Sequence, residues 1–130
     1  DEDFAATIAA AEEVRYESAF TFIFSPRAGT EAASLPDQVP DEVKHERLEQ
    51  LVETVQRIAA GRSAERIGRV EEVLVEGPSR TDASLLRGRT RRNTTVNFTG
   101  AARPGDLVEV LVEGATSTTL RGRELARAAA

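Results

Sequence analysis

The segment from Gly88 to Phe98 reads Gly-Arg-Thr-Arg-Arg-Asn-Thr-Thr-Val-Asn-Phe, and its pattern is typical of a β-strand. Side chains of a strand alternate between two faces. One face carries the arginines Arg87, Arg89 and Arg91. The other face carries the small and apolar residues Leu86, Gly88 and Thr90. A row of guanidinium groups suits a polyanion, because each guanidinium can donate two hydrogen bonds to one phosphate.

The residues around this row favour RNA as the polyanion. Amide side chains and an aromatic ring follow the arginines, and such groups hydrogen-bond to and stack on the bases of folded or single-stranded RNA. The candidate RNA-binding residues are Arg80, Arg87, Arg89, Arg91, Arg92, Asn93 and Phe98, with Asn97, Arg121 and Arg123 as an extension of the surface. Two interpretations stay open for the arginines, RNA binding and a strand that arginines merely keep soluble. Phe98 either stacks on a base or ends a strand in the core.

The charge of the chain is unevenly distributed along its length, although the net charge is −5. Residues 1–61 hold five Lys or Arg and thirteen Asp or Glu, a net charge of −8. Residues 62–130 hold twelve Arg and nine Asp or Glu, a net charge of +3. Such asymmetry indicates two units with different partners. We therefore expect one domain at residues 1–61 and a basic, RNA-binding domain at residues 62–130.

The basic half has the pattern of short strands separated by turns. The expected strands cover residues 67–76, 85–92, 95–98, 107–113 and 118–125, with turns at Gly77-Pro78 and Pro104-Gly105-Asp106. Five short strands in this half predict a small closed barrel, because closure removes exposed sheet edges. The expected architecture is an OB-like five-stranded β-barrel, a fold that commonly binds oligonucleotides.

The acidic half has the pattern helix, strand, loop, helix. Residues 3–17 carry apolar side chains at helical spacing, and a second helix is expected from Pro40 to Gly61. Between them, Tyr16 to Ser25 is nearly continuously apolar, which is typical of a strand covered on both faces in a parallel α/β sheet. A single buried strand needs neighbours, so we expect residues 1–61 to be the end of a larger α/β domain.

The loop after this expected strand is a second candidate site. It follows the carboxyl end of the strand, where α/β sheets and barrels bind ligands. Its candidate residues near a cofactor or substrate are Ser25, Arg27, Gly29 and Thr30. Arg27 either contacts a ligand or braces the loop through backbone carbonyls. Gly29 and Thr30 either shape a binding loop or form a plain turn.

The composition excludes several kinds of site. The chain has no cysteine and a single histidine, His45, so it offers no disulfide, thiol nucleophile or cysteine-ligated iron–sulfur cluster. No apolar run approaches the ~20 residues that span a bilayer, and no signal segment opens the chain. We therefore expect a soluble, cytoplasmic protein with no membrane partner. The absence of methionine, even at residue 1, predicts a piece of a longer chain.

Three segments in this order carry a family resemblance. They are Phe20-Thr-Phe-Ile-Phe-Ser-Pro-Arg-Ala-Gly-Thr30, Gly68-Arg-Val-Glu-Glu-Val-Leu-Val-Glu-Gly-Pro-Ser79 and the Gly88–Phe98 segment. The chain resembles, over nearly all of its length, the C-terminal part of the MiaB-type tRNA methylthiotransferases. The resemblance implies that residues 1–61 end a radical-SAM partial (β/α) barrel. It also implies that residues 62–130 form a TRAM domain, a small β-barrel that binds tRNA.

The resemblance carries further expectations about function. Enzymes of this family use two [4Fe-4S] clusters and S-adenosylmethionine to add a methylthio group to C2 of an isopentenylated adenosine beside the anticodon. It thus implies a tRNA-docking role, with the tRNA anticodon arm and the missing N-terminal and radical-SAM domains as partners. It implies no catalytic residue and no cofactor bound by this chain alone, because the cluster cysteines lie upstream. Two alternatives stay open: an enzyme that methylthiolates an aspartate of a ribosomal protein, and a non-enzymatic RNA-binding module.

Overall fold

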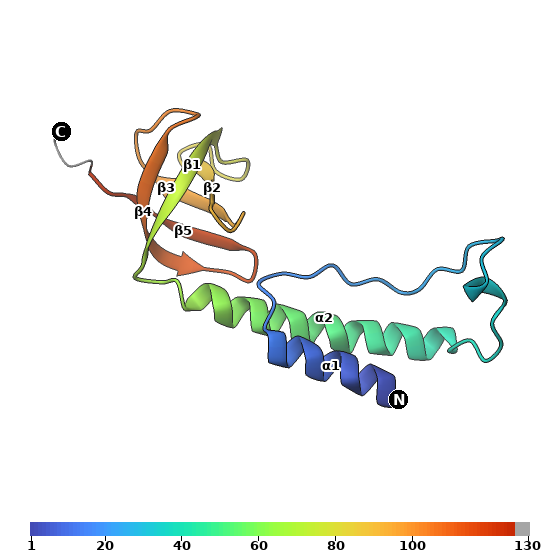
Figure 1. The fold of residues 1–130 in the computed structure, drawn as a ribbon. Helices are drawn as coiled ribbons and strands as arrows, with labels where there is room; N and C mark the ends of the chain where they lie inside the picture. The colour runs from blue at the N-terminus through green and yellow to red at the C-terminus, as the bar shows by residue number, and fades with distance from the viewer. Residues whose placement is uncertain (127–130) are drawn as a thin grey trace. The chain divides into compact units, whose positions relative to one another are not determined.

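The computed structural model describes residues 1–126, which form a helical unit and a β-barrel unit (Figure 1). The helical unit is Asp1–Ile58, and the barrel unit begins at Ala59. In chain order the elements are α1 (Glu2–Val14), the 3-10 helix η1 (Ala32–Ser34), α2 (Asp41–Ala64), β1 (Val70–Pro78), β2 (Leu86–Thr90), β3 (Thr95–Thr99), β4 (Leu107–Ala115) and β5 (Thr119–Glu124). The two α-helices and the closed five-stranded barrel of these residues confirm the expected α+β class.

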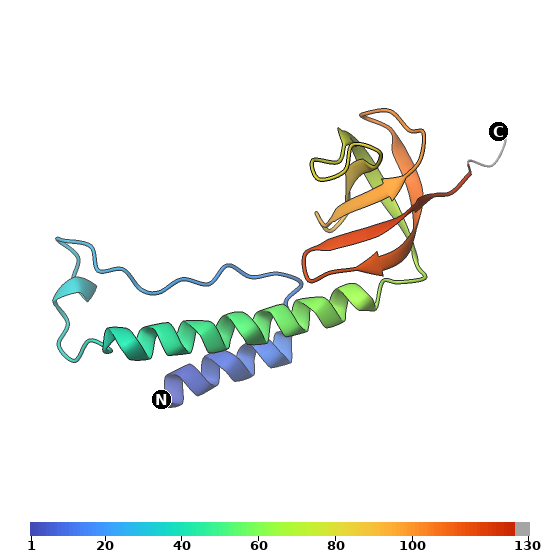
Figure 2. The same cartoon turned by 180° about the vertical axis from the view of Figure 1, so that it is seen from behind.

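The barrel strands follow the order β1-β2-β3-β5-β4, and β4 pairs with β1 to close the sheet (Figure 2). Neighbouring strands are antiparallel except β3 and β5, which are parallel. Every strand expected in the basic half is present, with its ends displaced by a few residues. The closed ladder satisfies the backbone hydrogen bonds that an open sheet would leave at its edges.

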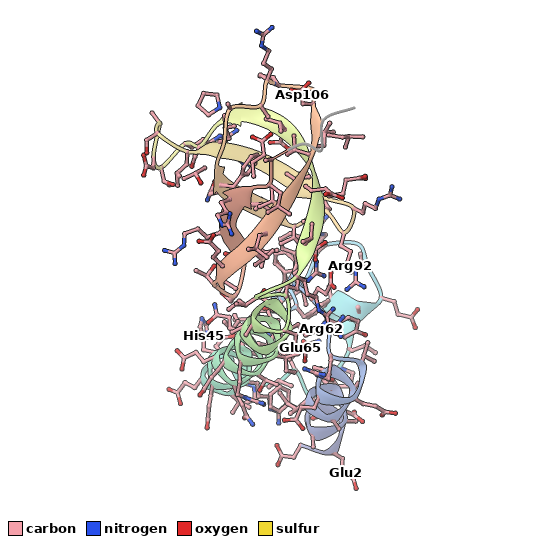
Figure 3. The ribbon with its side chains drawn as sticks, turned by 90° about the vertical axis from the view of Figure 1, so that its left-hand side faces the viewer. Glu2, His45, Arg62, Glu65, Arg92 and Asp106 are labelled. Carbon is pink, nitrogen blue, oxygen red and sulfur yellow. The ribbon has the colours of Figure 1, made fainter. Side chains whose placement is uncertain are left out.

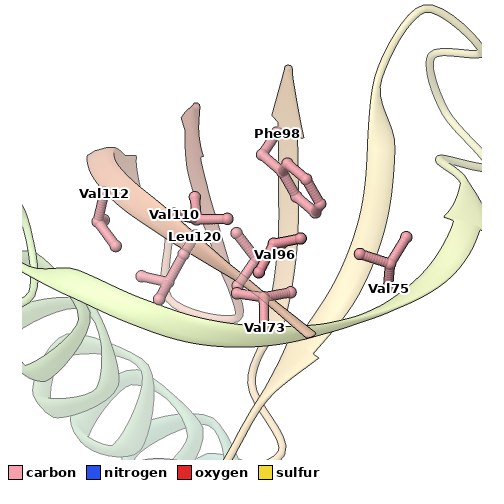
Figure 4. Packing of buried hydrophobic residues seen from close by; sticks show 8 residues of the cluster. Val73, Val75, Val96, Phe98, Val110, Val112 and Leu120 are labelled. Atoms are coloured by element: carbon pink, nitrogen blue, oxygen red, sulfur yellow. The ribbon is translucent and has the colours of Figure 1, made fainter. Parts of the chain in front are cut away.

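Inward-pointing side chains of the strands fill the barrel. In β1 buried and exposed residues alternate along the strand, and β4 shows the same alternation. The core residues are Val73, Val75, Val96, Phe98, Val108, Val110, Val112 and Leu120. Figure 4 shows labelled members of this cluster converging on the barrel interior. Because burying one such side chain contributes roughly 1.5–3 kcal/mol of transfer free energy, the barrel has a substantial core of its own.

Two buried glycines allow neighbouring strands to approach closely. A Cβ atom at Gly88 would overlap the carbonyl oxygen of Leu74 and Cγ1 of Val73. A Cβ atom at Gly122 would overlap the carbonyl oxygen of Leu111. These positions require glycine because any side chain would force two paired strands apart.

The helical unit contains α1 and the first part of α2, which run parallel to each other (Figure 1). Ion pairs join the two helices: Arg57 Nη2 lies 3.2 Å from Glu12 Oε1, and Arg47 Nη2 lies 2.5 Å from Asp1 Oδ1. The Arg47 guanidinium also lies 5.5 Å from the centre of the Phe4 ring. These ion pairs and the cation–π contact link Asp1 and α1 to α2.

The strand expected from Tyr16 to Ser25 is absent from the structure of residues 1–126, so this prediction is wrong. The segment is irregular, and its aromatic side chains are not buried, since Phe20 is 93% exposed and Phe22 is 83% exposed. A strand needs neighbouring backbone to hydrogen-bond, and β1 to β5 pair only with one another. The apolar segment therefore has no partner strand among the described residues.

The end expected for the second helix at Gly61 is also wrong. The helix α2 continues to Ala64, and the Glu65 N–H donates to the Gly61 carbonyl at 3.2 Å. A glycine inside a helix costs only about 1 kcal/mol relative to alanine, so its presence does not force an end. The chain turns instead at Gly68, whose φ is +86°.

Candidate nucleic-acid interface

The Gly88–Phe98 segment forms a hairpin of β2 and β3. β2 ends at Thr90 and β3 begins at Thr95, and the two strands are antiparallel. In the turn, the Asn93 φ is +63°, a left-handed conformation that asparagine adopts more readily than most residues. The Thr90 N–H donates to the Thr94 carbonyl at 3.0 Å, and the Asn93 N–H donates to the Thr90 carbonyl at 2.9 Å. The expectation that the strand reaches Arg92 is wrong, because this turn reverses the chain first.

The predicted arginine face of β2 is present, and a carboxylate from β1 lies against it. Arg87 and Arg89 point away from the core, whereas Gly88 and Thr90 on the other face are buried. Arg89 Nε lies 2.9 Å from Glu76 Oε1. Arg87 Nε lies 3.7 Å from Glu76 Oε2, which is too long for a hydrogen bond. One glutamate of β1 therefore faces two of the predicted arginines.

The third predicted arginine, Arg91, lies in the turn and not in the strand. Its side chain is 83% exposed, and its Nε lies 2.9 Å from Oε1 of Glu72, which projects outward from β1. Three arginines thus share two glutamates along the outer surface of β1 and β2. Exposed ion pairs of this kind contribute about 0–1 kcal/mol each, so a polyanion can displace the carboxylates at little cost.

The other predicted polar residues lie in the loops that flank β2. Arg92 and Asn93 are exposed in the β2–β3 turn, and Asn93 Oδ1 accepts a hydrogen bond from Arg89 Nη1 at 3.1 Å. Figure 3 labels Arg92 in this turn and Asp106 in the turn before β4. Arg80 lies in the loop between β1 and β2, is exposed, and has no ion pair within residues 1–126.

The loop that carries Arg80 is held by Asp82. The Asp82 Oδ1 atom accepts hydrogen bonds from the Ser84 hydroxyl at 2.5 Å and from the Ser84 N–H at 3.0 Å. The hydroxyl hydrogen bond, followed by the backbone one, lowers the pKa of Asp82 below its usual value. The loop conformation is therefore coupled to an ionised carboxylate at neutral pH.

Phe98 does not belong to the candidate interface. Its side chain is 0% exposed and packs among the core valines of the barrel. β3 places Phe98 on its inward face together with Val96, while Asn97 points outward. The stacking role proposed for Phe98 is therefore wrong, since a ring inside the barrel cannot reach a base at the surface.

Two hollows of about 270 Å³ each open on the barrel surface near β3 and β5. One is lined by Ser79, Arg80, Thr81, Arg87, Thr95, Asn97 and Thr119, and the other by Leu85, Asn97, Ala115, Thr116, Thr119, Leu120 and Arg121. The hollows share Asn97 and Thr119. The hydroxyl lining of these hollows was not predicted from the sequence, because the lining depends on the parallel pairing of β3 with β5. No local sequence pattern predicts a pairing between strands that lie so far apart along the chain.

The second predicted site is a surface turn in the helical unit. Gly29 has a φ of +85°, and the Thr30 N–H donates to the Arg27 carbonyl at 3.2 Å. The Thr30 hydroxyl oxygen also accepts a hydrogen bond from the Ala33 N–H at 3.3 Å, at the start of η1. Ser25 and Arg27 are exposed, and the Arg27 side chain has no hydrogen-bond or ion-pair partner within residues 1–126. Arg27 therefore does not brace this loop in the described part of the chain.

Residues 1–126 contain no group of three His, Cys, Asp or Glu side chains placed to hold a metal ion. Neither α1 nor α2 combines the length and the apolarity that crossing a bilayer requires.

Comparison with known proteins finds a domain family and a set of relatives. The model of the TRAM domain matches residues 64–125. The relatives include proteins named tRNA-2-methylthio-N(6)-dimethylallyladenosine synthase from three organisms. The Clostridium botulinum (strain Hall) protein is 46% identical over 126 residues, which cover 96% of this chain and 28% of the relative. The Clostridium novyi (strain NT) protein is 47% identical over 94% of this chain and 27% of the relative. The Thermoanaerobacter sp. (strain X514) protein is 46% identical over 94% of this chain and 26% of the relative. The chain thus spans about a quarter of the length of these relatives.

Proposed function

We propose that this chain docks tRNA. The chain belongs to the tRNA-2-methylthio-N(6)-dimethylallyladenosine synthase family and corresponds to its C-terminal, TRAM-containing part. The parent enzyme in this proposal is a radical-SAM methylthiotransferase of the cytoplasm. It adds a methylthio group to C2 of N6-isopentenyladenosine next to the tRNA anticodon. The barrel binds the anticodon arm, and the reaction takes place in the upstream domains.

The observation that carries this proposal is the arginine stripe of the barrel, which we define as Arg87, Arg89 and Arg91 on β2 and its turn. The stripe lies on a domain whose half of the chain has a net charge of +3, although the whole chain is acidic. Its glutamate partners are at least 40% exposed, so the ion pairs are weak and exchangeable. A phosphate offers each guanidinium the same two-pronged contact with higher charge.

The cofactors implied by the family do not fit the residues of this chain. A [4Fe-4S] cluster needs cysteine thiolates, and the sequence has none. The described residues also hold no alternative cluster of metal-ligating side chains. In the proposal, both clusters and S-adenosylmethionine are bound by the upstream domains, and no step of the reaction is assigned to residues 1–126.

The exposed apolar segment from Tyr16 to Ser25 supports a further part of the proposal, its pairing with the upstream radical-SAM domain. Phe20 and Phe22 are more than four-fifths exposed, which is unusual for aromatic side chains in a segment that is apolar on both faces. Relatives roughly three and a half times as long supply the chain that could cover it. Pairing of this segment with the upstream domain would also place Ser25, Arg27, Gly29 and Thr30 at the mouth of the radical-SAM partial barrel.

Hydrogen exchange tests the pairing. The amides of residues 20–24 should exchange rapidly in the 130-residue chain and be protected in the longer protein that contains the upstream domains. Equal, rapid exchange in both proteins would show that the segment does not join a sheet.

Binding to an anticodon stem-loop tests the docking role. The double variant Arg89→Gln/Arg91→Gln should bind an isopentenylated anticodon stem-loop more weakly, with a salt dependence flattened by up to about 1.4–1.8 in log K per log salt, because each phosphate contact contributes ~0.7–0.9. Arg57→Gln is the matched control, since it removes an ion-paired arginine of the helical unit. Unchanged affinity and unchanged slope in the double variant would reduce the arginine stripe to a solubilising surface.

A further inference from the structure

Three outward side chains form a row across neighbouring strands of the barrel. β3 lies between β2 and β5 (Figure 1), and the register places Asn97 of β3 beside Arg87 of β2 and beside Arg121 of β5. Neighbouring strands are about 4.8 Å apart, so the two arginines start roughly 10 Å from each other with the amide between them. We call these three residues the amide row.

Two polar atoms of the amide row are buried without a partner. Asn97 Oδ1 and Arg87 Nε are shielded from solvent, and neither makes a hydrogen bond within the described residues. Buried polar atoms of native proteins are nearly always hydrogen-bonded, so an exception calls for an explanation. A ligand that brings both an acceptor and a donor would satisfy the two atoms.

The charges near the row differ from those of the arginine stripe. Arg121 has no ion pair within residues 1–126, and the same holds for Arg80 at the rim of the adjoining hollow. Arg123, two residues further along the same face of β5, is paired with Glu113 at 2.8 Å. The two hollows that meet at Asn97 include no acidic residue in their linings. Arg80 and Arg121 are therefore available to an anion without first losing a carboxylate.

The unpaired acceptor Asn97 Oδ1 limits which kinds of ligand fit the amide row. A free phosphate would satisfy the arginines, but its oxygens are acceptors and would face Asn97 Oδ1 unfavourably. A nucleobase presents a donor next to an acceptor on its edge, which matches a carboxamide. The hydroxyls of Thr95 and Thr119 lie in the hollow beside Asn97 and can bond to a ribose. One unstacked nucleotide supplies base, ribose and phosphates together.

We propose that the amide row is a subsite for one unstacked nucleotide of the bound RNA, with the Asn97 carboxamide on the edge of its base and Arg80 and Arg121 on the neighbouring phosphates. This inference rests on the proposed RNA-binding function of the barrel. Asn97 is then a specificity-determining residue, because it contacts a base, whereas Arg89 and Arg91 of the arginine stripe contact only the backbone.

The test compares short single-stranded RNA with the same backbone lacking its bases. Oligonucleotides of about ten residues match the ~4–16 nucleotides that such barrels cover. Asn97→Ala in the 130-residue chain should weaken binding of the base-bearing RNA about 5- to 10-fold, as expected for one lost hydrogen-bonding group, and leave the abasic RNA unaffected. Asn97→Val, with a side chain that favours strands, should give the same result and guards against a folding defect.

Arg121→Ala should weaken both RNAs and lower the salt slope by about 0.7, the contribution of one phosphate on a single strand. Arg123→Ala is the matched control on the same face of β5 and should change the slope by less. Circular dichroism and thermal unfolding establish that each variant is folded.

The outcomes separate this inference from the function on which it rests. Failure of the unchanged chain to bind either RNA would overturn RNA binding itself. Binding by the unchanged chain that is equal for base-bearing and abasic RNA would overturn the base contact alone. An equal loss on both RNAs in the Asn97 variants would likewise show that Asn97 acts on the backbone or on the fold.

Discussion

Glu76→Gln should strengthen RNA binding, because Glu76 is the carboxylate that occupies two arginines of the stripe. Its Oε1 lies 2.9 Å from Arg89 Nε, and its Oε2 lies 3.7 Å from Arg87 Nε. Glutamine keeps the shape of the side chain and removes its charge. Both guanidinium groups then become available to phosphate without competition.

The size of the gain follows from the ion pairs that a bound phosphate has to displace. An exposed ion pair contributes at most about 1 kcal/mol, so the loss of one pair strengthens binding by up to about 5-fold. Glu76 faces two arginines, so the expected gain is up to about 5-fold for one pair and on the order of 25-fold for two. The cost in stability is small: pairs exposed to this degree contribute at most about 1 kcal/mol each, and a domain of this size loses roughly 4–8 °C in Tm per kcal/mol.

Fluorescence anisotropy with a labelled anticodon stem-loop across a salt series measures both affinity and slope. Glu12→Gln is the matched control, because it frees Arg57 in the helical unit with the same change of charge. Both variants should remain folded. A Glu76→Gln chain that binds no more tightly than Glu12→Gln, with the same slope as the unchanged chain, would refute the idea that the stripe engages phosphate.

Three further predictions concern the barrel. Phe98→Ala should lower the free energy of unfolding by about 3–5 kcal/mol in urea denaturation, because the ring is fully buried; a loss below about 1 kcal/mol would contradict its place in the core. Gly88→Ala should destabilise the barrel by roughly 1–3 kcal/mol through overlap with Leu74 and Val73, whereas Gly61→Ala, whose new methyl would meet no atom within 4 Å, should stabilise α2 by about 0.5–1 kcal/mol. Thermal melts giving both substitutions the same sign would contradict this contrast. The lowered pKa of Asp82 means that its hydrogen bonds stabilise the loop at any pH above the usual aspartate pKa and are lost as the pH falls through the lowered one. The Ser84 amide chemical shift should change with this titration. A chemical shift that stays constant over the same pH range would contradict the coupling between Asp82 and the loop.

The strands of the barrel were predictable because their signals are local. Val108, Val110 and Val112 alternate with exposed residues along one strand, and the same three side chains fill the core. The turn at Pro104-Gly105 likewise lies where the chain reverses, with a Gly105 φ of +92°. Period and turn chemistry act within a few residues, so a sequence reveals them directly.

The candidate interface was only partly predictable because its contacts are not local. The arginine face of β2 follows from alternation, but its partners Glu72 and Glu76 depend on the register of β1 against β2. The neighbours of Asn97 depend on the parallel pairing of β3 with β5. A sequence that alternates correctly does not state which strand lies beside which.

The prediction of a strand from Tyr16 to Ser25 was wrong for the opposite reason. Its composition is that of a buried strand, and the prediction placed the neighbouring strands in a larger α/β domain outside this chain. Backbone hydrogen bonds to another strand define a strand, and residues 1–126 provide none to this segment. An apolar composition indicates that a segment is suited to burial, but it does not show which surface buries the segment.

The central claim, that this chain docks tRNA, is tested most directly by measuring its binding to an isopentenylated anticodon stem-loop over a series of salt concentrations. We predict micromolar binding whose log K falls steeply and linearly with log salt, as expected when several phosphates are contacted. No binding by a chain whose barrel is folded by circular dichroism would contradict the claim, and would leave recognition to the upstream domains or to a protein partner.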